Sequence, residues 1–198
     1  MRVIAGEYGG REIRTVEGPG YRPATAKVRQ ALFSMLEARG VHWPETRVLD
    51  LFAGSGSLAV ESLSRGAAHA CLVEKNPRAV ACIKRTLSEL GIGPELARVL
   101  SGDLFQLLNK TPEAAYDLVF IDPPYGKDLL PPALAKALER GWIAPEAFVV
   151  AEVEARAEVG EVPPQLIPQA ERLYGQTRIL LWLNSTPGSP STPAPSIP

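Results

Sequence analysis

The sequence predicts an α/β fold, in which helices cover both faces of a doubly wound, mostly parallel seven-stranded sheet. From residue 47 onward, short apolar segments alternate with amphipathic ones, in the order strand, helix, strand. The strand segments are rich in Val, Leu and Ala and lack a clean polar alternation, which is typical of buried parallel strands. A glycine-rich turn follows the first of these strands, as in α/β folds that bind a ligand at the strand ends.

Length and composition are consistent with one domain and one core. The chain has 198 residues, 45% of them hydrophobic, and a net charge of −1, so it is not a basic nucleic-acid binder as a whole. No stretch approaches the length of a membrane span or a signal peptide, so we expect a cytoplasmic protein with no membrane partner. Cys71 and Cys82 lack the close spacing of metal ligands, and no metal is expected.

Residues 1–40 are expected to form a small N-terminal extension. Residues 2–5 and 12–15 flank a glycine-containing segment and predict a β-hairpin. Thr25 suits the N-cap of a helix with 3.6-residue apolar periodicity, which Gly40 ends. Residues 1–30 contain six Lys or Arg and three Glu, so this extension either meets a polyanion or forms a solvated edge.

Residues 41–183 are expected to form the main domain. Asn76-Pro77 suits a helix start, Gly91 suits its end, and residues 165–173 and 177–183 predict an antiparallel edge hairpin. Residues 184–198 carry no charge and five prolines, which predicts a disordered tail. The remaining expected strands are 47–52, 69–74, 97–101, 116–121 and 147–153, and the expected helices are about 57–65, 77–90, 103–109 and 129–140.

The glycine turn after the first strand of this domain is the candidate cofactor site. Gly54 and Gly56 lack a Cβ atom, which allows a tight turn and lets a ligand approach the backbone. The segment also fits the dinucleotide fingerprint, and the absence of a following Lys-Ser/Thr pair excludes a P-loop. Because ligands bind at the carboxyl ends of parallel strands, we expect a nucleotide-like ligand here.

Carboxylates stand at the ends of three successive strands. Asp50 would repel a pyrophosphate but could pair with a cationic, amino-acid-like group. Glu74, 20 residues after Gly54, can hold two ribose hydroxyls, and Asp103 can accept from an adenine amine. The trio fits S-adenosylmethionine, which carries a sulfonium, an ammonium and a ribose. Alternatively, each carboxylate simply caps the helix that follows it.

The candidate catalytic residues are Asp122, Pro123, Pro124 and Tyr125, which end the fourth strand. Proline keeps the preceding residue extended, so this segment leaves the sheet as a stiff rim. A planar amine becomes nucleophilic when its N–H groups are held by acceptors, and the Asp122 carboxylate and the Pro123 carbonyl are suitable acceptors. Tyr125 could stack on the base. The alternative is an ordinary turn with a tyrosine that covers the core.

These motifs together resemble those of the class I S-adenosylmethionine-dependent amino-methyltransferases with a D/N-P-P-Y/F motif, and within them the RsmD family. The resemblance covers residues 1 to about 183 and is most specific in the N-terminal motifs. The motifs that carry it are Met1–Arg11, Arg22-Pro23, Val28-Arg29, Ala31–Phe33, Asp50–Ser57, Ser64–Ala67, Val73–Lys75, Gly102-Asp103, Asp122–Gly126 and Tyr174-Gly175.

The resemblance implies a Rossmann-like fold and methyl transfer from S-adenosylmethionine to the exocyclic N2 amine of a guanine in 16S ribosomal RNA. The partner would be small-subunit RNA or its ribonucleoprotein, with the guanine flipped into the rim at 122–125. Residues 1–40 would face the RNA. The side chains that would contact its phosphates are Arg2, Arg11, Arg22, Lys27 and Arg29. The predicted cofactor contacts are Asp50, Phe52, Gly54, Ser55, Gly56, Glu74, Lys75, Asp103 and Leu104.

The chain departs from the family pattern at Ala26, where an acidic residue is usual, and at Gln30, where the family has glutamate. Three other hypotheses stay open: a DNA adenine-N6 or protein glutamine methyltransferase, a nicotinamide-dependent oxidoreductase, and a non-catalytic RNA-binding module. The chain leaves no stretch for a large DNA-recognition domain. An oxidoreductase would not explain the rim at 122–125, and the intact acceptors disfavour a non-catalytic module.

Overall fold

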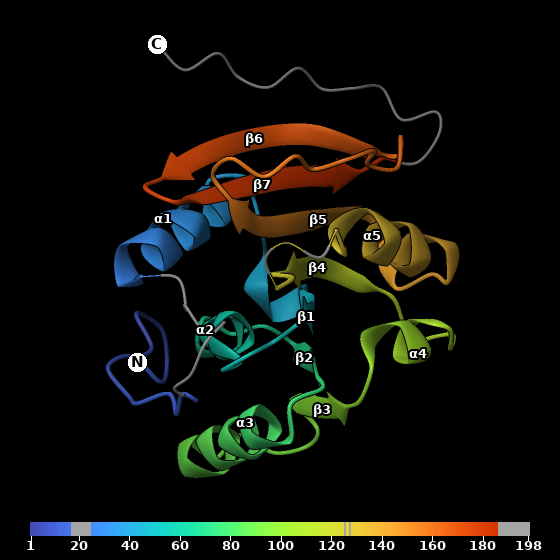
Figure 1. The fold of residues 1–198 in the computed structure, drawn as a ribbon. Helices are drawn as coiled ribbons and strands as arrows, with labels where there is room; N and C mark the ends of the chain where they lie inside the picture. The colour runs from blue at the N-terminus through green and yellow to red at the C-terminus, as the bar shows by residue number, and fades with distance from the viewer. Residues whose placement is uncertain (17–24, 125, 127, 186–198) are drawn as a thin grey trace.

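A computed structural model describes residues 1–16, 25–124, 126 and 128–185. Its centre is a seven-stranded sheet in the order β3-β2-β1-β4-β5-β7-β6, which confirms the predicted doubly wound fold (Figure 1). The first five strands are parallel to one another, whereas β7 runs antiparallel to both β5 and β6. The strands are β1 Arg47–Leu51, β2 His69–Glu74, β3 Ala97–Ser101, β4 Tyr116–Ile121, β5 Ile143–Glu154, β6 Leu166–Tyr174 and β7 Thr177–Asn184.

Helices cover both faces of the sheet, and each face has its own apolar core. Side chains of α1, α2 and α3 pack on one face, and side chains of α4 and α5 pack on the other (Figure 1). No helix within the described ranges is long and apolar enough to cross a membrane. The helices are α1 Ala26–Glu37, α2 Ser57–Ser64, α3 Pro77–Leu90, α4 Leu104–Leu108 and α5 Leu130–Glu139, with an unpredicted 3-10 turn at Trp43–Glu45.

The N-terminal extension shares the core of the main domain. The Phe33 ring of α1 lies 5.6 Å from the Trp43 ring and 6.0 Å from the Phe120 ring of β4, between ring centroids. Val3 and Ile13 are buried in the same apolar cluster. Residues 1–16 and α1 therefore belong to the core on the face of the sheet that carries α2 and α3, and residues 1–16 contact these two helices.

The predicted N-terminal hairpin is present but shorter than predicted, with one antiparallel bridge, Arg2 to Glu12, and backbone hydrogen bonds from Val3 to the Arg11 carbonyl and from Ile13 to the Met1 carbonyl. The backbone N–H groups of Ile4 and Ala5 donate to the Glu61 carboxylate of α2, at 2.7 and 3.1 Å, and not to a neighbouring strand. The pairing of the hairpin therefore does not extend to Ile4 and Ala5, whose N–H groups are used by the helix.

Two boundaries at the C-terminal side also differ from the prediction. Strand β5 begins at Ile143 and is longer than predicted, with an irregular register against β4 between Tyr116 and Leu118. Asn184, predicted as the first residue of a disordered tail, ends β7 and donates from its side chain to the Ala144 carbonyl at 2.7 Å. Residues 186–198 of the predicted tail lie outside the described residues.

Candidate functional site

The glycine turn and the Asp-Pro-Pro segment leave neighbouring strands at the same edge of the sheet. Strands β1 and β4 are parallel partners, and Leu51 is in register with Ile121. The next residue, Asp122, donates its backbone N–H to the Leu51 carbonyl at 3.4 Å. The two sequence motifs, about 70 residues apart in the chain, therefore begin side by side. Tyr125 lies outside the described residues, so its stacking role stays a prediction.

The turn after β1 holds several residues in the left-handed region. Phe52 has φ 62°, Gly54 φ 55° and Gly56 φ 72°. Glycine adopts this conformation freely, whereas Phe52 is strained there, and such strain clusters at ligand-binding sites. The turn is fixed at its start because Ala53 donates its backbone N–H to the Val73 carbonyl of β2 at 3.0 Å.

We expect Gly56→Ala to destabilise the turn more than the same change at another left-handed glycine. A Cβ atom at Gly56 would lie 2.8 Å from Leu72 Cδ2, whereas a Cβ at Gly91, with φ 73°, would meet nothing within 4 Å. Both variants carry the left-handed penalty of about 1–2 kcal/mol, and only Gly56→Ala adds a clash. Urea denaturation measures both, and equal losses would show that Leu72 moves aside freely.

Glu74 connects the glycine turn to the start of α3. Its Oε2 atom accepts the Gly54 backbone N–H at 2.8 Å, and its Oε1 atom accepts the Asn76 backbone N–H at 2.7 Å. The side chain is buried. Glu74 thus sets the shape of the turn, and its carboxylate keeps lone pairs for further donors, so its predicted ribose contact stays a prediction.

Asp50 is a buried acid under the same turn. Only 3% of its surface is exposed, and burial raises its pKa to about 7. The Ala59 backbone N–H, which donates to Oδ2 at 3.3 Å, opposes this rise, and the negative charge of Glu74 adds to it. A carboxyl group in this state gains stability from any cation that approaches it.

Asp103 behaves as the capping hypothesis expected. Its Oδ1 atom accepts the backbone N–H groups of Phe105 and Gln106, at 3.0 and 3.2 Å, and so caps α4. The side chain is exposed, so it can also accept from a ligand through Oδ2. Of the other predicted contacts, Leu104 is buried in the second core cluster and Lys75 is exposed.

Glu152 of β5 lies beside the candidate site and was not among the predicted residues. It is 6% exposed, and burial raises its pKa to about 7. A hydrogen bond with the Thr177 side chain acts in the opposite direction and lowers the pKa. The pKa of Asp122 is raised mainly by burial. The nearby charge of Glu152 raises it further, and the charge of Asp50 makes a smaller contribution. One signal was available, since Glu152 is the only charged residue in the apolar run 147–153.

The predicted nucleic-acid contacts divide into exposed and buried residues. Arg2, Arg11 and Lys27 are exposed, with the first two donating to the carbonyls of Gly10 and Glu89. Arg22 lies outside the described residues.

Arg29 requires a correction, because its side chain is 1% exposed and cannot reach a phosphate in this structure. It donates to the Arg2 carbonyl at 2.8 Å and lies 3.9 Å from Glu61. Its position on the apolar face of α1 explains the burial, because Leu32, Phe33 and Leu36 follow it at helical spacing.

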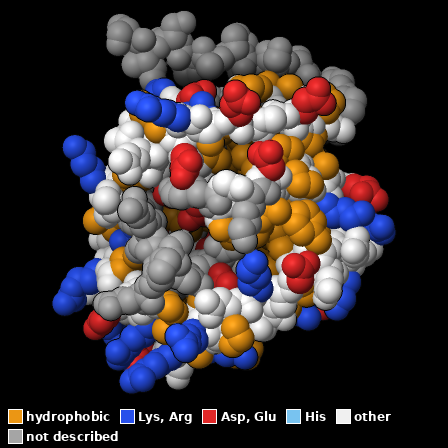
Figure 2. Space-filling view, viewed as in Figure 1, with side chains coloured by type: hydrophobic (Ala, Val, Ile, Leu, Met, Phe, Trp, Pro, Cys, Tyr) orange, Lys and Arg blue, Asp and Glu red, His pale blue; other side chains and the backbone are white. Residues whose placement is uncertain are grey.

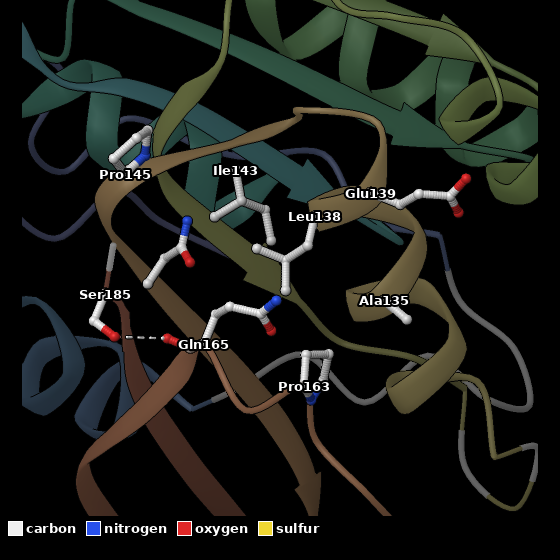
Figure 3. A pocket seen from close by; sticks show the side chains of 9 residues that line it. Ala135, Leu138, Glu139, Ile143, Pro145, Pro163, Gln165 and Ser185 are labelled. Carbon is white, nitrogen blue, oxygen red and sulfur yellow. Dashed lines mark hydrogen bonds between the residues drawn. The ribbon is translucent and has the colours of Figure 1, made fainter. Parts of the chain in front are cut away.

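Two cavities differ in their relation to these strand ends. One of about 250 Å³ borders Pro123 and Pro124 and extends to Val153 and Val159. The other, of about 430 Å³, lies at the opposite end of β5, between Ile143, Leu138 and Pro163, where Ser185 donates to the Gln165 carbonyl (Figure 3). Ile143 and Glu152 are about 30 Å apart along an extended strand, so the larger cavity is not part of the site.

Comparison with known proteins assigns the fold and the family. A family model described as Conserved hypothetical protein 95 matches residues 1–183. The ribosomal RNA small subunit methyltransferase D of Escherichia coli strain K12 is 33% identical over 190 residues, which cover 95% of this chain and 92% of that protein. The solved structure of the Escherichia coli protein yhhF has a TM-score of 0.83 at 31% identity, covering 93% of this chain and 98% of its own.

More distant similarity shows the fold alone. An RNA methyltransferase from Salinibacter ruber, solved with S-adenosyl-L-homocysteine, has a TM-score of 0.61 at 19% identity, covering 83% of this chain and 94% of its own. The seven-stranded mixed sheet is therefore the class I methyltransferase fold. With a family model matched along residues 1–183 and a relative of similar length at 33% identity, the chain belongs to the RsmD family.

Proposed function

We propose that this protein transfers a methyl group from S-adenosylmethionine to the exocyclic N2 amine of a guanine in 16S ribosomal RNA. The observation that carries the proposal is the adjacency of the glycine turn after β1 and the Asp122 segment after β4. The similarity to a small-subunit RNA methyltransferase over 95% of the chain supports this substrate class. A ribosomal substrate also accords with the predicted cytoplasmic localisation.

The residues at the strand ends fit S-adenosylmethionine. Asp50 and Glu74 are buried carboxyl groups, and within the described ranges no Lys or Arg forms an ion pair with either. A cationic ligand would stabilise them, whereas the pyrophosphate of a dinucleotide would be repelled. Glu74 and Asp103 would hold the ribose and the adenine, and Gly54 and Gly56 would let the ligand reach the backbone. The bound cofactor supplies an electrophilic methyl group on sulfur.

Asp122 and Pro123 are proposed to activate the target amine. The lone pair of an exocyclic amine is delocalised into the base, and acceptors on its N–H groups make it more nucleophilic during the attack. The Asp122 carboxyl group and the Pro123 carbonyl leave the sheet beside the glycine turn. Holding nitrogen, methyl and sulfur in line supplies much of the acceleration, because the reacting groups no longer have to find each other.

The exposed basic residues are proposed to bind the RNA backbone. Lys and Arg side chains gather over the region of α3 and the N-terminal segment (Figure 2). Arg11 and Arg14 of the N-terminal segment both contact Glu89 of α3, so the two regions form one surface. Such a surface contributes affinity and positioning, and leaves base selection to the pocket.

We expect Lys27→Gln to weaken RNA binding and to lower its salt dependence. Lys27 is exposed at the start of α1. Loss of one phosphate contact reduces the slope of log affinity against log salt by about 0.7–0.9. Lys110→Gln is the matched control, because Lys110 is exposed on the loop that leads to the amino end of β4, opposite the strand ends that carry the candidate site. Equal slopes for the two variants, from filter binding at several salt concentrations, would remove Lys27 from the interface.

Transfer of labelled methyl from S-adenosylmethionine to small-subunit RNA or its ribonucleoprotein tests the function. Digestion of the product to nucleosides should yield N2-methylguanosine. The specific alternative, a DNA adenine-N6 or protein glutamine methyltransferase with the same rim, would yield N6-methyladenine or a methylated amino acid. Either product, or no transfer above the level of an Asp122→Ala variant, would overturn the proposal.

A further inference from the structure

Glu152 lies next to Asp122 on the neighbouring parallel strand. The β4–β5 register pairs Phe120 with Val150 and Ile121 with Ala151, so Asp122 and Glu152 are the following pair. Because side chains alternate along a strand, both leave the face of the sheet that carries Phe120 and Val150. Neighbouring strands are about 4.8 Å apart, which places the two carboxyl groups within reach of each other.

The surroundings of these two groups disfavour a double negative charge. Glu152 is buried, Asp122 is partly buried, and within the described ranges neither forms an ion pair with Lys or Arg. The polar groups that influence the ionisation of the two carboxyl groups come from three other strands. Asp50 of β1 faces Asp122, Glu74 of β2 faces Asp50, and the Thr177 side chain of β7 hydrogen-bonds with Glu152. Two of these three side chains are acids and the third is a neutral hydroxyl, so none of them supplies a positive charge to offset the repulsion.

We propose that Glu152 is a positioning residue whose carboxyl group shares one proton with that of Asp122. The two groups, named here the carboxyl pair, take up the proton that the target amine loses when it accepts the methyl group. Two carboxyl groups side by side in a buried site bind one proton between them because the second ionisation places like charges together. The inference rests on the proposed function, which supplies the amine.

The step balances in atoms and charge. A bond forms between N2 and the methyl carbon as the bond between the methyl carbon and sulfur breaks, and the sulfonium becomes a neutral thioether. The nitrogen loses one proton to the ionised oxygen of Asp122, so the carboxyl pair changes from one proton to two. That proton passes to solvent after the product leaves, which restores the pair. No oxidant, reductant or metal is required.

A titration of the free protein tests the carboxyl pair without any methyl transfer. The side-chain carboxyl carbons of Asp122 and Glu152 can be followed by ¹³C NMR as the pH is raised. We expect the two signals to report a coupled titration, and Glu152→Gln to move the Asp122 midpoint to lower pH by about one unit or more, since a neighbouring negative charge is removed. An unchanged Asp122 midpoint in Glu152→Gln overturns the proposal.

The pH profile of methyl transfer tests whether the carboxyl pair takes part in the reaction. Activity needs an ionised oxygen, so kcat/KM should fall as the pH falls through the titration of the pair. In Glu152→Gln the acid limb of the profile should move to lower pH, because the Asp122 pKa is lowered. On the plateau kcat should fall about tenfold or more, since Asp122 alone is a weaker base, while the cofactor Kd stays unchanged.

Two further variants separate this role from a structural one. Glu152→Asp keeps a carboxyl group and should restore the coupled titration and part of kcat. If Glu152 had only a structural role, the isosteric Glu152→Gln should instead retain more activity than Glu152→Asp. Glu161→Gln removes the same charge from an exposed position before β6 and should leave both the titration and kcat unchanged. A wild-type pH profile in Glu152→Gln overturns the proposal. If the native chain methylates no RNA guanine, the proposed function is wrong. The NMR titration then still tests whether Asp122 and Glu152 share a proton.

Discussion

Asp122→Ala is expected to reduce the rate of methyl transfer by about 10²–10³-fold, the usual loss when one acceptor or donor of a preorganised site is removed. The Asp122 carboxyl group follows β4 directly and lies beside the turn that is proposed to hold the cofactor. Its contacts with the amine strengthen as positive charge develops on the nitrogen, so the loss should appear in kcat. Cofactor affinity, measured by calorimetry, should change little, because Asp50 and Glu74 remain.

Two substitutions control this measurement. Asp122→Asn keeps a carbonyl oxygen but no charge, so we expect a loss smaller than that of alanine. Asp117→Ala changes the same residue type on the same strand, but at its amino end, where the exposed Asp117 accepts the Arg47 backbone N–H at 2.8 Å. That variant should transfer methyl at the native rate. If Asp122→Ala also does so, the amine is held by other groups and the proposed mechanism is wrong.

Glu61→Ala is expected to lower the free energy of unfolding by about 3–5 kcal/mol, because it leaves a buried charge without its partner. Glu61 is fully buried and accepts from Ile4, Ala5 and Arg65, the last at 3.0 Å. It also lies 3.9 Å from Arg29, whose pKa burial already lowers. Removal of the carboxylate would strand Arg29 in the core and release the first residues of the chain. Urea denaturation measures the loss.

Glu37→Ala is the matched control for this prediction. Glu37 contacts the same Arg65 guanidinium at 2.6 Å, but 43% of its side chain is exposed, so its ion pair should contribute less than about 1 kcal/mol. Hydrogen exchange adds a local measurement, since the amides of Ile4 and Ala5 should lose protection only in Glu61→Ala. Similar stability of the two variants would mean that water replaces the carboxylate in this network.

The order of elements and the proximity of the two motifs could be predicted because both depend on local patterns. Apolar runs and their spacing gave the parallel strands, and the turn at Gly54 and the segment after Ile121 were expected to meet at one edge. The structure confirms this, with Leu51 and Ile121 in register. These features follow from residue type and chain order alone.

Glu152 and Arg29 show where such patterns fail. The role of Glu152 depends on which residue of the β4 side lies beside it. The register between β4 and β5 decides this, and that register is fixed by long-range packing. The count of charges in residues 1–30 treated Arg29 as exposed, although its helical spacing to Leu32 and Phe33 places it on the buried face. Charge composition describes a surface only after burial is known.

The packing of the first residues against later ones has a consequence for the nascent chain. Phe33 packs against Phe120, and Glu7 donates its backbone N–H to the Ser64 carbonyl at 2.7 Å. Translation proceeds at about 5–20 residues per second, so several seconds separate the synthesis of Phe33 from that of Phe120. During this interval the apolar cluster that holds Val3, Ile13 and Phe33 is incomplete, and these side chains are candidates for chaperone binding. These side chains are therefore made before the strand and helices on which they pack.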